Sequence, residues 1–133
     1  MNQPKNDGKY HWTNHAKDKM RYYRISESLI KRIVRFPERV EEGIAPRTSA
    51  GMQARKVGGK VNEEIWVMWQ EIRQKENLRP ELRSREGKSQ KFIQPKRRII
   101  SAWRYPGQSP LRGKIPIPDD VLESLENESG LKF

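Results

Sequence analysis

The sequence predicts an α+β fold in which two N-terminal helices pack on a twisted antiparallel sheet of about four strands. Three observations support this class. Apolar residues recur at helical spacing over residues 13–36, apolar segments rich in β-branched and aromatic residues follow at 64–70 and 98–105, and Gly or Pro separates the segments. Helices followed by a run of strands are typical of α+β proteins. The 133 residues correspond to a single domain.

Two helices are predicted, the first over residues 13–23 and the second over residues 26–36. Thr13 and Ser26 are suitable N-caps, because a hydroxyl oxygen can accept a hydrogen bond from a free backbone N–H in the first turn. Pro37 ends the second helix. Each helix has one apolar stripe, formed by Trp12, Ala16, Met20 and Tyr23 in the first and by Leu29, Ile30, Ile33 and Val34 in the second.

Four strands are predicted after the helices, at residues 39–44, 48–57, 64–70 and 98–105. Ala45-Pro46, Gly58-Gly59 and Pro106-Gly107 mark the turns between or after them. The pattern leaves open which face of the last strand meets the helices, because both faces mix apolar and polar residues. Strict alternation along this strand places Arg98, Ile100, Ala102 and Arg104 on one face and Ile99, Ser101, Trp103 and Tyr105 on the other.

The compact domain is predicted to span residues 10–106, with the remaining segments around it. Residues 1–9 are polar and predict a flexible tail. Residues 71–91 are mostly charged and predict a long basic arm between the two strongest strands. Residues 107–133 predict a Pro-rich extension with a short acidic helix at 119–127, where Asp119 and Asp120 suit the positive end of the helix dipole.

The net charge of +11 is unevenly distributed. Residues 1–35 hold nine Lys/Arg and three Asp/Glu, residues 71–98 hold ten and four, and residues 119–133 hold one and five. Two basic blocks indicate a polyanionic partner, and nucleic acid is favoured over a membrane surface because no basic segment has an apolar helical face. The chain has no cysteine and no apolar run of membrane-spanning length, so we expect a cytoplasmic protein without metal, cofactor or membrane partner.

Two short motifs carry a resemblance to a known family. They are H-A-x-x-x-M-R at residues 15–21 and I-I-S-A-x-R at residues 99–104. Over residues 11–106 the chain resembles a family of small bacterial domains related to the BrnT-type toxins of the RelE-like superfamily. The resemblance implies two helices on a twisted antiparallel sheet, ribonuclease activity and a neutralising antitoxin protein as partner. It places polar groups of that family at His15, Arg21 and Arg104.

Four residues are candidates for metal-independent RNA cleavage: His15, Lys19, Arg21 and Arg104. His15 titrates near neutrality, so it could act as base toward a ribose 2′-hydroxyl or as acid toward the leaving oxygen. The three cations could stabilise the charge that develops on the phosphate. The structural alternative for His15 is a hydrogen bond near the start of the helix.

Further residues are candidates for binding the nucleic acid. Trp103 and Tyr105 could stack on bases, whereas Trp12, Trp66 and Trp69 are expected in the core. The predicted phosphate contacts are Arg24 at the end of the first helix, Arg97 and Arg98 on the last strand, and Arg73, Lys75, Arg79, Arg83, Arg85, Lys88 and Lys91 in the arm.

The leading hypothesis is therefore an RNA-binding RelE/BrnT-like protein that acts as an endoribonuclease toxin. The alternative is a non-catalytic module that binds RNA or the ribosome through the same basic surfaces. DNA binding is less favoured, because the sequence has no helix-turn-helix or zipper spacing. The acidic residues 119–128 are expected either to fold back and mask the basic surface or to dock a partner.

Overall fold

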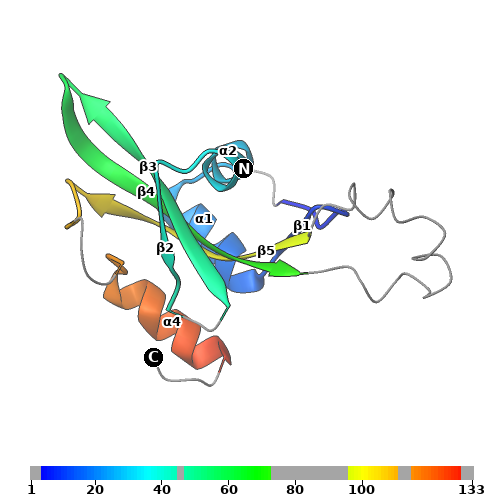
Figure 1. Ribbon diagram of the computed structural model, residues 1–133. Helices are drawn as coiled ribbons and strands as arrows, with labels where there is room; N and C mark the ends of the chain where they lie inside the picture. Colours follow the sequence, from blue (N-terminus) through cyan, green and yellow to red (C-terminus); the bar gives the residue numbers. More distant parts are fainter. Residues whose placement is uncertain (1–3, 45–46, 73–95, 111–114, 130–133) are drawn as a thin grey trace, which may run out of the picture.

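The computed structural model describes residues 4–44, 47–72, 96–110 and 115–129, with side chains up to residue 126 in the last range (Figure 1). The α+β class is confirmed. Within these ranges a five-stranded sheet in the order β1-β5-β4-β3-β2 is combined with three helices. The elements in chain order are β1 (Tyr10–Trp12), α1 (Asn14–Tyr23), α2 (Glu27–Arg35), β2 (Arg39–Glu42), β3 (Thr48–Val57), β4 (Lys60–Ile72), β5 (Lys96–Pro106) and α4 (Asp119–Ser129).

The sheet is mixed, which corrects the expectation of a purely antiparallel sheet of about four strands. Neighbouring strands from β2 to β5 run antiparallel. The additional strand β1 runs parallel to β5, with Tyr10 opposite Arg97 and Trp12 opposite Ile99. Three residues are too few to show an alternating pattern, so only the distant partner strand identifies this segment as a strand.

Both N-terminal helices begin at the predicted caps. Thr13 Oγ1 accepts a hydrogen bond from the Ala16 N–H at 3.0 Å, and Ser26 Oγ accepts one from the Leu29 N–H at 3.2 Å. The Thr13 hydroxyl also donates to the carbonyl oxygen of Ile99 at 3.0 Å. This hydrogen bond joins the start of α1 to β5 directly after β1 ends, so α1 continues along the edge of β5 that β1 leaves uncovered.

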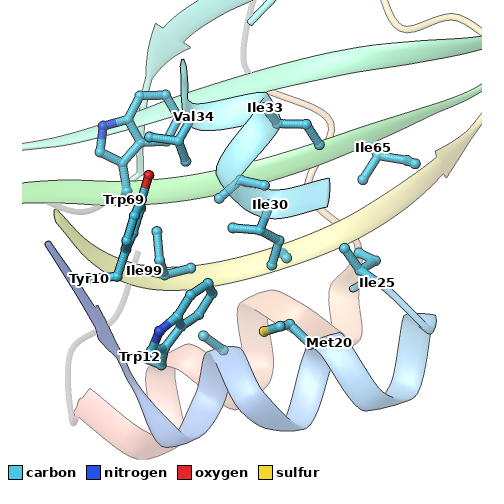
Figure 2. Close-up of a cluster of buried hydrophobic side chains, with 13 residues drawn as sticks. Tyr10, Trp12, Met20, Ile25, Ile30, Ile33, Val34, Ile65, Trp69 and Ile99 are labelled. Atoms are coloured by element: carbon cyan, nitrogen blue, oxygen red, sulfur yellow. The ribbon is translucent and has the colours of Figure 1, made fainter. Parts of the chain in front are cut away.

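The first hydrophobic cluster lies between the sheet and the two N-terminal helices (Figure 2). Met20 on α1 and Ile30 and Ile33 on α2 point toward the sheet, as their helical spacing predicts. Gly51 allows a close approach here, since a Cβ at this position would lie 2.9 Å from the Trp69 ring. The cluster consists of Tyr10, Trp12, Ala16, Met20, Ile25, Ile30, Ile33, Val34, Ile65, Val67, Trp69, Ile99 and Ala102.

A second hydrophobic cluster covers the opposite face of the sheet. Val121 and Leu125 of α4 pack there against β3, β4 and β5, and the Trp103 indole donates a hydrogen bond to the carbonyl oxygen of Pro116 at 2.8 Å. The boundary predicted at residue 106 therefore separates the sheet from the segment that covers its second face. The buried members are Ala50, Met52, Trp66, Met68, Trp103, Ile115, Val121 and Leu125.

A β-bulge corrects the predicted faces of the last strand. The register between β4 and β5 shifts between Met68 and Trp69, which leaves Ile100 without a direct partner. One extra residue reverses the alternation. As a result, Ile99 and Ala102 both belong to the cluster beneath α1 and α2, although strict alternation places them on opposite faces.

Candidate nucleic-acid interface

His15 lies inside the fold. Only 4% of the residue is exposed, and its Nε2 is hydrogen-bonded to Ser101 Oγ at 2.8 Å. Burial, together with the nearby charge of Lys19, lowers the pKa of His15 to about 4. The imidazole is therefore neutral at physiological pH and is held against β5. The hydrogen bond of His15 is thus made to β5 rather than to the start of the helix, where Thr13 is the cap.

We expect His15 to make the protein less stable in mild acid. Its pKa is about 4 in the folded state, below the reference value of 6.5. As the pH falls, the unfolded chain therefore binds the proton first, and stability is lost between about pH 6.5 and pH 4. The full contribution is about 3 kcal/mol. Urea unfolding at several pH values across this range gives the free energy of unfolding as a function of pH. This free energy should fall steeply with falling pH in the wild type and in His11→Gln, but only slightly in His15→Gln. An equal slope in all three proteins would contradict the assignment.

Lys19 and Arg104, two of the predicted catalytic cations, are held by acidic partners. Lys19 Nζ lies 2.8 Å from a carboxylate oxygen of Asp120 on α4, and the Tyr23 hydroxyl donates to the same carboxylate. Arg104 Nη1 lies 2.6 Å from Glu63 Oε1. The guanidinium of Arg104 also donates to the backbone carbonyl oxygens of residues 23 and 24.

The contacts of Asp120 explain its acidity. Burial raises the pKa of this carboxyl group, but the hydrogen bonds from Lys19 and Tyr23 outweigh it, so the pKa lies below its usual value. The charged carboxylate thus fastens the start of α4 to α1.

Of the other predicted residues, Arg21 and Arg24 are exposed at the end of α1, away from the buried His15. The structure thus brings His15 and Lys19 together near Asp120, whereas Arg21 is exposed on α1 and Arg104 is bound to Glu63.

The structure brings together a different group of basic side chains where β1 pairs with β5: three cations around the imidazole of His11. His11 lies directly opposite Arg98, and Lys96 points to the same face two residues earlier. Burial lowers the pKa of His11, and the positive charges of Arg98, Lys96 and Lys17 lower it further. These four side chains, which are all partly exposed, are called here the cationic cluster: His11, Lys17, Lys96 and Arg98.

The cationic cluster has no acidic partner among the residues that the structure describes. Arg98 Nη1 donates to the neutral Gln70 amide oxygen at 3.1 Å, and no ion pair involves the other three members within the same ranges. Arg97 lies on the opposite face of β5, opposite the buried Tyr10. A phosphate oxygen approaching the cluster would therefore meet several unneutralised charges at once.

Only Arg98 of this cluster is among the residues predicted from the sequence. The run Lys96-Arg97-Arg98 was a usable signal for Lys96. No sequence signal identifies His11 and Lys17 as its neighbours, because a parallel strand pair and the start of α1 bring them there.

The two predicted stacking residues belong to the second hydrophobic cluster. Trp103 is fully buried and stacks on Trp66, with ring centroids 6.3 Å apart and an interplanar angle of 8°. Tyr105 is partly buried against the same cluster. Trp12, Trp66 and Trp69 are buried, as expected. The predicted arm residues, Arg73, Lys75, Arg79, Arg83, Arg85, Lys88 and Lys91, lie outside the described residues.

The residues that the structure describes contain neither a candidate metal centre nor a helix suited to crossing a membrane. No group of three or more His, Asp or Glu side chains in these ranges could hold a metal ion. None of the helices in the same part of the chain has the length and apolar character needed to cross a membrane.

Comparisons with known proteins do not point to a function, so the α+β fold and the cationic cluster are the features that bear on it. No family model, no curated protein and no solved structure matches the chain.

Proposed function

We propose that the protein is a non-catalytic RNA-binding module and that the cationic cluster contacts the phosphate backbone. The observation that supports this proposal is the convergence of the cations Lys17, Lys96 and Arg98 around His11, without an acidic partner in the described residues. Cations this close repel one another, and an anion relieves the repulsion. A polyanion gains more than a single anion, because each contacted phosphate releases condensed counterions.

The burial of His15 supports binding rather than cleavage. A general base must come within hydrogen-bond reach of the ribose hydroxyl, whereas His15 is 4% exposed and bonded to Ser101. Lys19 and Arg104 are engaged by Asp120 and Glu63. The endoribonuclease role implied by the BrnT-type resemblance is therefore the second candidate.

The resemblance to the RelE-like superfamily contributes the class of nucleic acid to the proposal. It favours RNA or the ribosome over DNA as the ligand, and the cytoplasm, where both occur, as the location. It also adds an acidic antitoxin-type protein as a possible partner of the same basic surface. The proposal includes a RelE/BrnT-like origin for part of the fold, namely the helices α1 and α2 and the strands β2 to β5.

Neutralising two members of the cluster should weaken RNA binding strongly. For single-stranded RNA, the slope of log affinity against log salt should change by about 1.4 in Lys96→Gln/Arg98→Gln, and affinity at 0.1 M salt should fall about 20-fold. Fluorescence anisotropy of a labelled, mixed-sequence RNA measures both quantities. Arg32→Gln/Arg35→Gln, which removes the same charge from exposed positions on α2, is the matched control and should retain most of the affinity.

Two results would change this assignment. If the cluster variant binds RNA as tightly as the wild type, with the same salt slope, the cluster is not the interface. Gel analysis of the same RNA in EDTA, and of translating ribosomes in magnesium, tests the second candidate. Cleavage by the wild type and not by His15→Ala would establish the endoribonuclease instead.

A further inference from the structure

The β3–β4 hairpin ends in a cationic tip. Val57 pairs with Lys60, and the two residues between them, Gly58 and Gly59, have φ values of 60° and 80°. Positive φ at both loop positions is typical of a type I′ turn, which matches the twist of the flanking strands. The register between the two strands shifts between Arg55 and Lys56, just before this turn.

The tip extends beyond the rest of the sheet (Figure 1). Pairing between β4 and β5 ends where Glu63 lies opposite Pro106, and the Asn62 carbonyl oxygen accepts a last hydrogen bond from the Gly107 N–H. Lys60 and Val61 pair with β3 alone. The side chain of Val57 at the end of β3 is among the most exposed apolar groups, with 66% of the residue accessible. Three exposed cations define what we call the hairpin tip: Arg55, Lys56 and Lys60.

No acidic side chain of the described part of the chain forms an ion pair with the hairpin tip. The two nearest acids in β4 have other partners. Glu63 binds Arg104, and the buried Glu64 accepts hydrogen bonds from the Trp66 indole and the Ser109 N–H. Arg55 lies directly opposite Glu63 in the β3–β4 pairing, whereas Lys56 and Lys60 form no ion pair within the described residues. The two lysines therefore carry most of the unneutralised charge of the hairpin tip.

Exposed cations on α1 connect the two surfaces. Lys17 belongs to the cationic cluster, and Arg21 follows it one turn later on the same side of α1. Arg24 is the left-handed C-cap directly after the helix. Arg104 fastens the end of α1 to β4 through the carbonyl oxygen of residue 24 and the Glu63 carboxylate. The end of α1 thus lies at the base of the hairpin, between the cluster and the tip.

The distance between the two surfaces follows from the strands. The hairpin tip lies at the Lys60 end of β4, and Lys96 of the cluster pairs with Ile72 at the other end. The 13 residues of β4 span about 40 Å at about 3.3 Å per residue. A stacked strand rises about 3.4 Å per phosphate, so this distance corresponds to about 12 nucleotides.

We infer that the protein binds an elongated RNA segment at two ends, with the cationic cluster at one end and the hairpin tip at the other. This inference rests on the proposed RNA binding and specifies the ligand of that site. The RNA must be long enough to reach both surfaces, and Arg21 and Arg24 contact the phosphates between them. A short oligonucleotide reaches only one surface.

The test compares RNA length with the loss of the tip charges. The probes are labelled single strands of about 6 and about 18 nucleotides, which lie below and above the estimated span. Against the long strand, Arg55→Gln/Lys56→Gln/Lys60→Gln should bind about 100-fold more weakly than the wild type at 0.1 M salt, with a salt slope changed by about 2. Against the short strand, the two proteins should agree within about threefold.

The controls separate the two proposals. Arg32→Gln/Arg35→Gln/Arg47→Gln removes the same net charge from other exposed positions and should retain wild-type length dependence. The cluster variant Lys96→Gln/Arg98→Gln should bind weakly at both lengths.

Three outcomes would overturn one of the two proposals. If the cluster variant binds weakly and the tip variant binds the long strand like the wild type, the two-ended site is wrong while the proposed function stands. A tip variant that is equally weak at both lengths also overturns the two-ended site. Wild-type affinity in the cluster variant would overturn the proposed function itself.

The exposed tip substitutions are expected to leave the fold intact, which thermal unfolding followed by circular dichroism checks directly. The single variant Lys60→Gln provides a second measurement if the triple variant is unstable. It should change the salt slope for the long strand by about 0.7 and leave that for the short strand unchanged.

Discussion

Ending the chain after Gly113 should unfold the protein at room temperature. The deletion removes Ile115, Val121 and Leu125 from the second hydrophobic cluster and exposes the Trp66 and Trp103 rings beneath them. Each buried aliphatic side chain contributes about 1.5–3 kcal/mol, so three of them account for roughly 5 kcal/mol or more. That amount is comparable with the entire stability of many domains of this size.

Circular dichroism and tryptophan fluorescence measure this effect, because the emission of Trp66 and Trp103 shifts to longer wavelength in water. A point version avoids deletion of the segment: Leu125→Ala should cost about 2–4 kcal/mol, whereas Glu123→Ala on the exposed side of α4 should change stability by less than about 0.5 kcal/mol. The masking hypothesis for residues 119–128 gives the opposite result, a folded truncated protein with increased RNA affinity. That outcome would contradict the role of α4 as part of the core.

Trp103→Ala should destabilise the protein by about 3–5 kcal/mol, because it leaves a large cavity in a fully buried site. The substitution removes the stack on Trp66 and the hydrogen bond to the Pro116 carbonyl oxygen. Trp103→Phe keeps an aromatic ring and removes the hydrogen bond, so we expect a smaller loss of about 1–2 kcal/mol. Chemical denaturation of the three proteins gives both differences.

RNA affinity provides the second readout for Trp103. A buried ring cannot stack on a base, so folded Trp103→Phe should bind RNA as tightly as the wild type. A tenfold loss of affinity at unchanged stability would show instead that Trp103 contacts the nucleic acid, as its position in the sequence first suggested.

The features that are determined by residues close together in the sequence were predictable. The caps Thr13 and Ser26, the apolar stripes of α1 and α2 and the turn at Gly58-Gly59 were confirmed, because each is determined within a few residues. The α+β class followed from the order of these elements. The expected core tryptophans were also buried, since a chain with few aliphatic residues has little else to fill its interior.

The features that depend on distant residues were not predictable. The strand at Tyr10–Trp12 exists through its pairing with β5, and the bulge at Ile100 is defined by the register of β4. The acidic composition of α4 suggested an electrostatic role. Its packing role depends on Val121 and Leu125, which have a partner only because that face of the sheet is apolar.

The same distinction applies to the candidate site. Composition predicted a polyanionic partner, but the role of each cation depends on its neighbours in the fold. Lys19 and Arg104 meet the carboxylates of Asp120 and Glu63, which lie 101 and 41 residues away. Lys17, Lys96 and Arg98 are unneutralised cations near His11, which the parallel strand pair places opposite Arg98.

The pairing of β1 with β5 has a consequence for synthesis of the protein. Thr13, at the end of β1, is hydrogen-bonded to a residue 87 positions later in the chain. At about 5–20 residues per second, a ribosome needs roughly 4 to 17 s to make that interval. During this time Tyr10 and Trp12, which are buried in the finished protein, have no strand to pair with. The N-terminal segment is therefore made early but reaches its final position only after β5 has left the ribosome, and until then its aromatic side chains are exposed to chaperones and to other nascent chains.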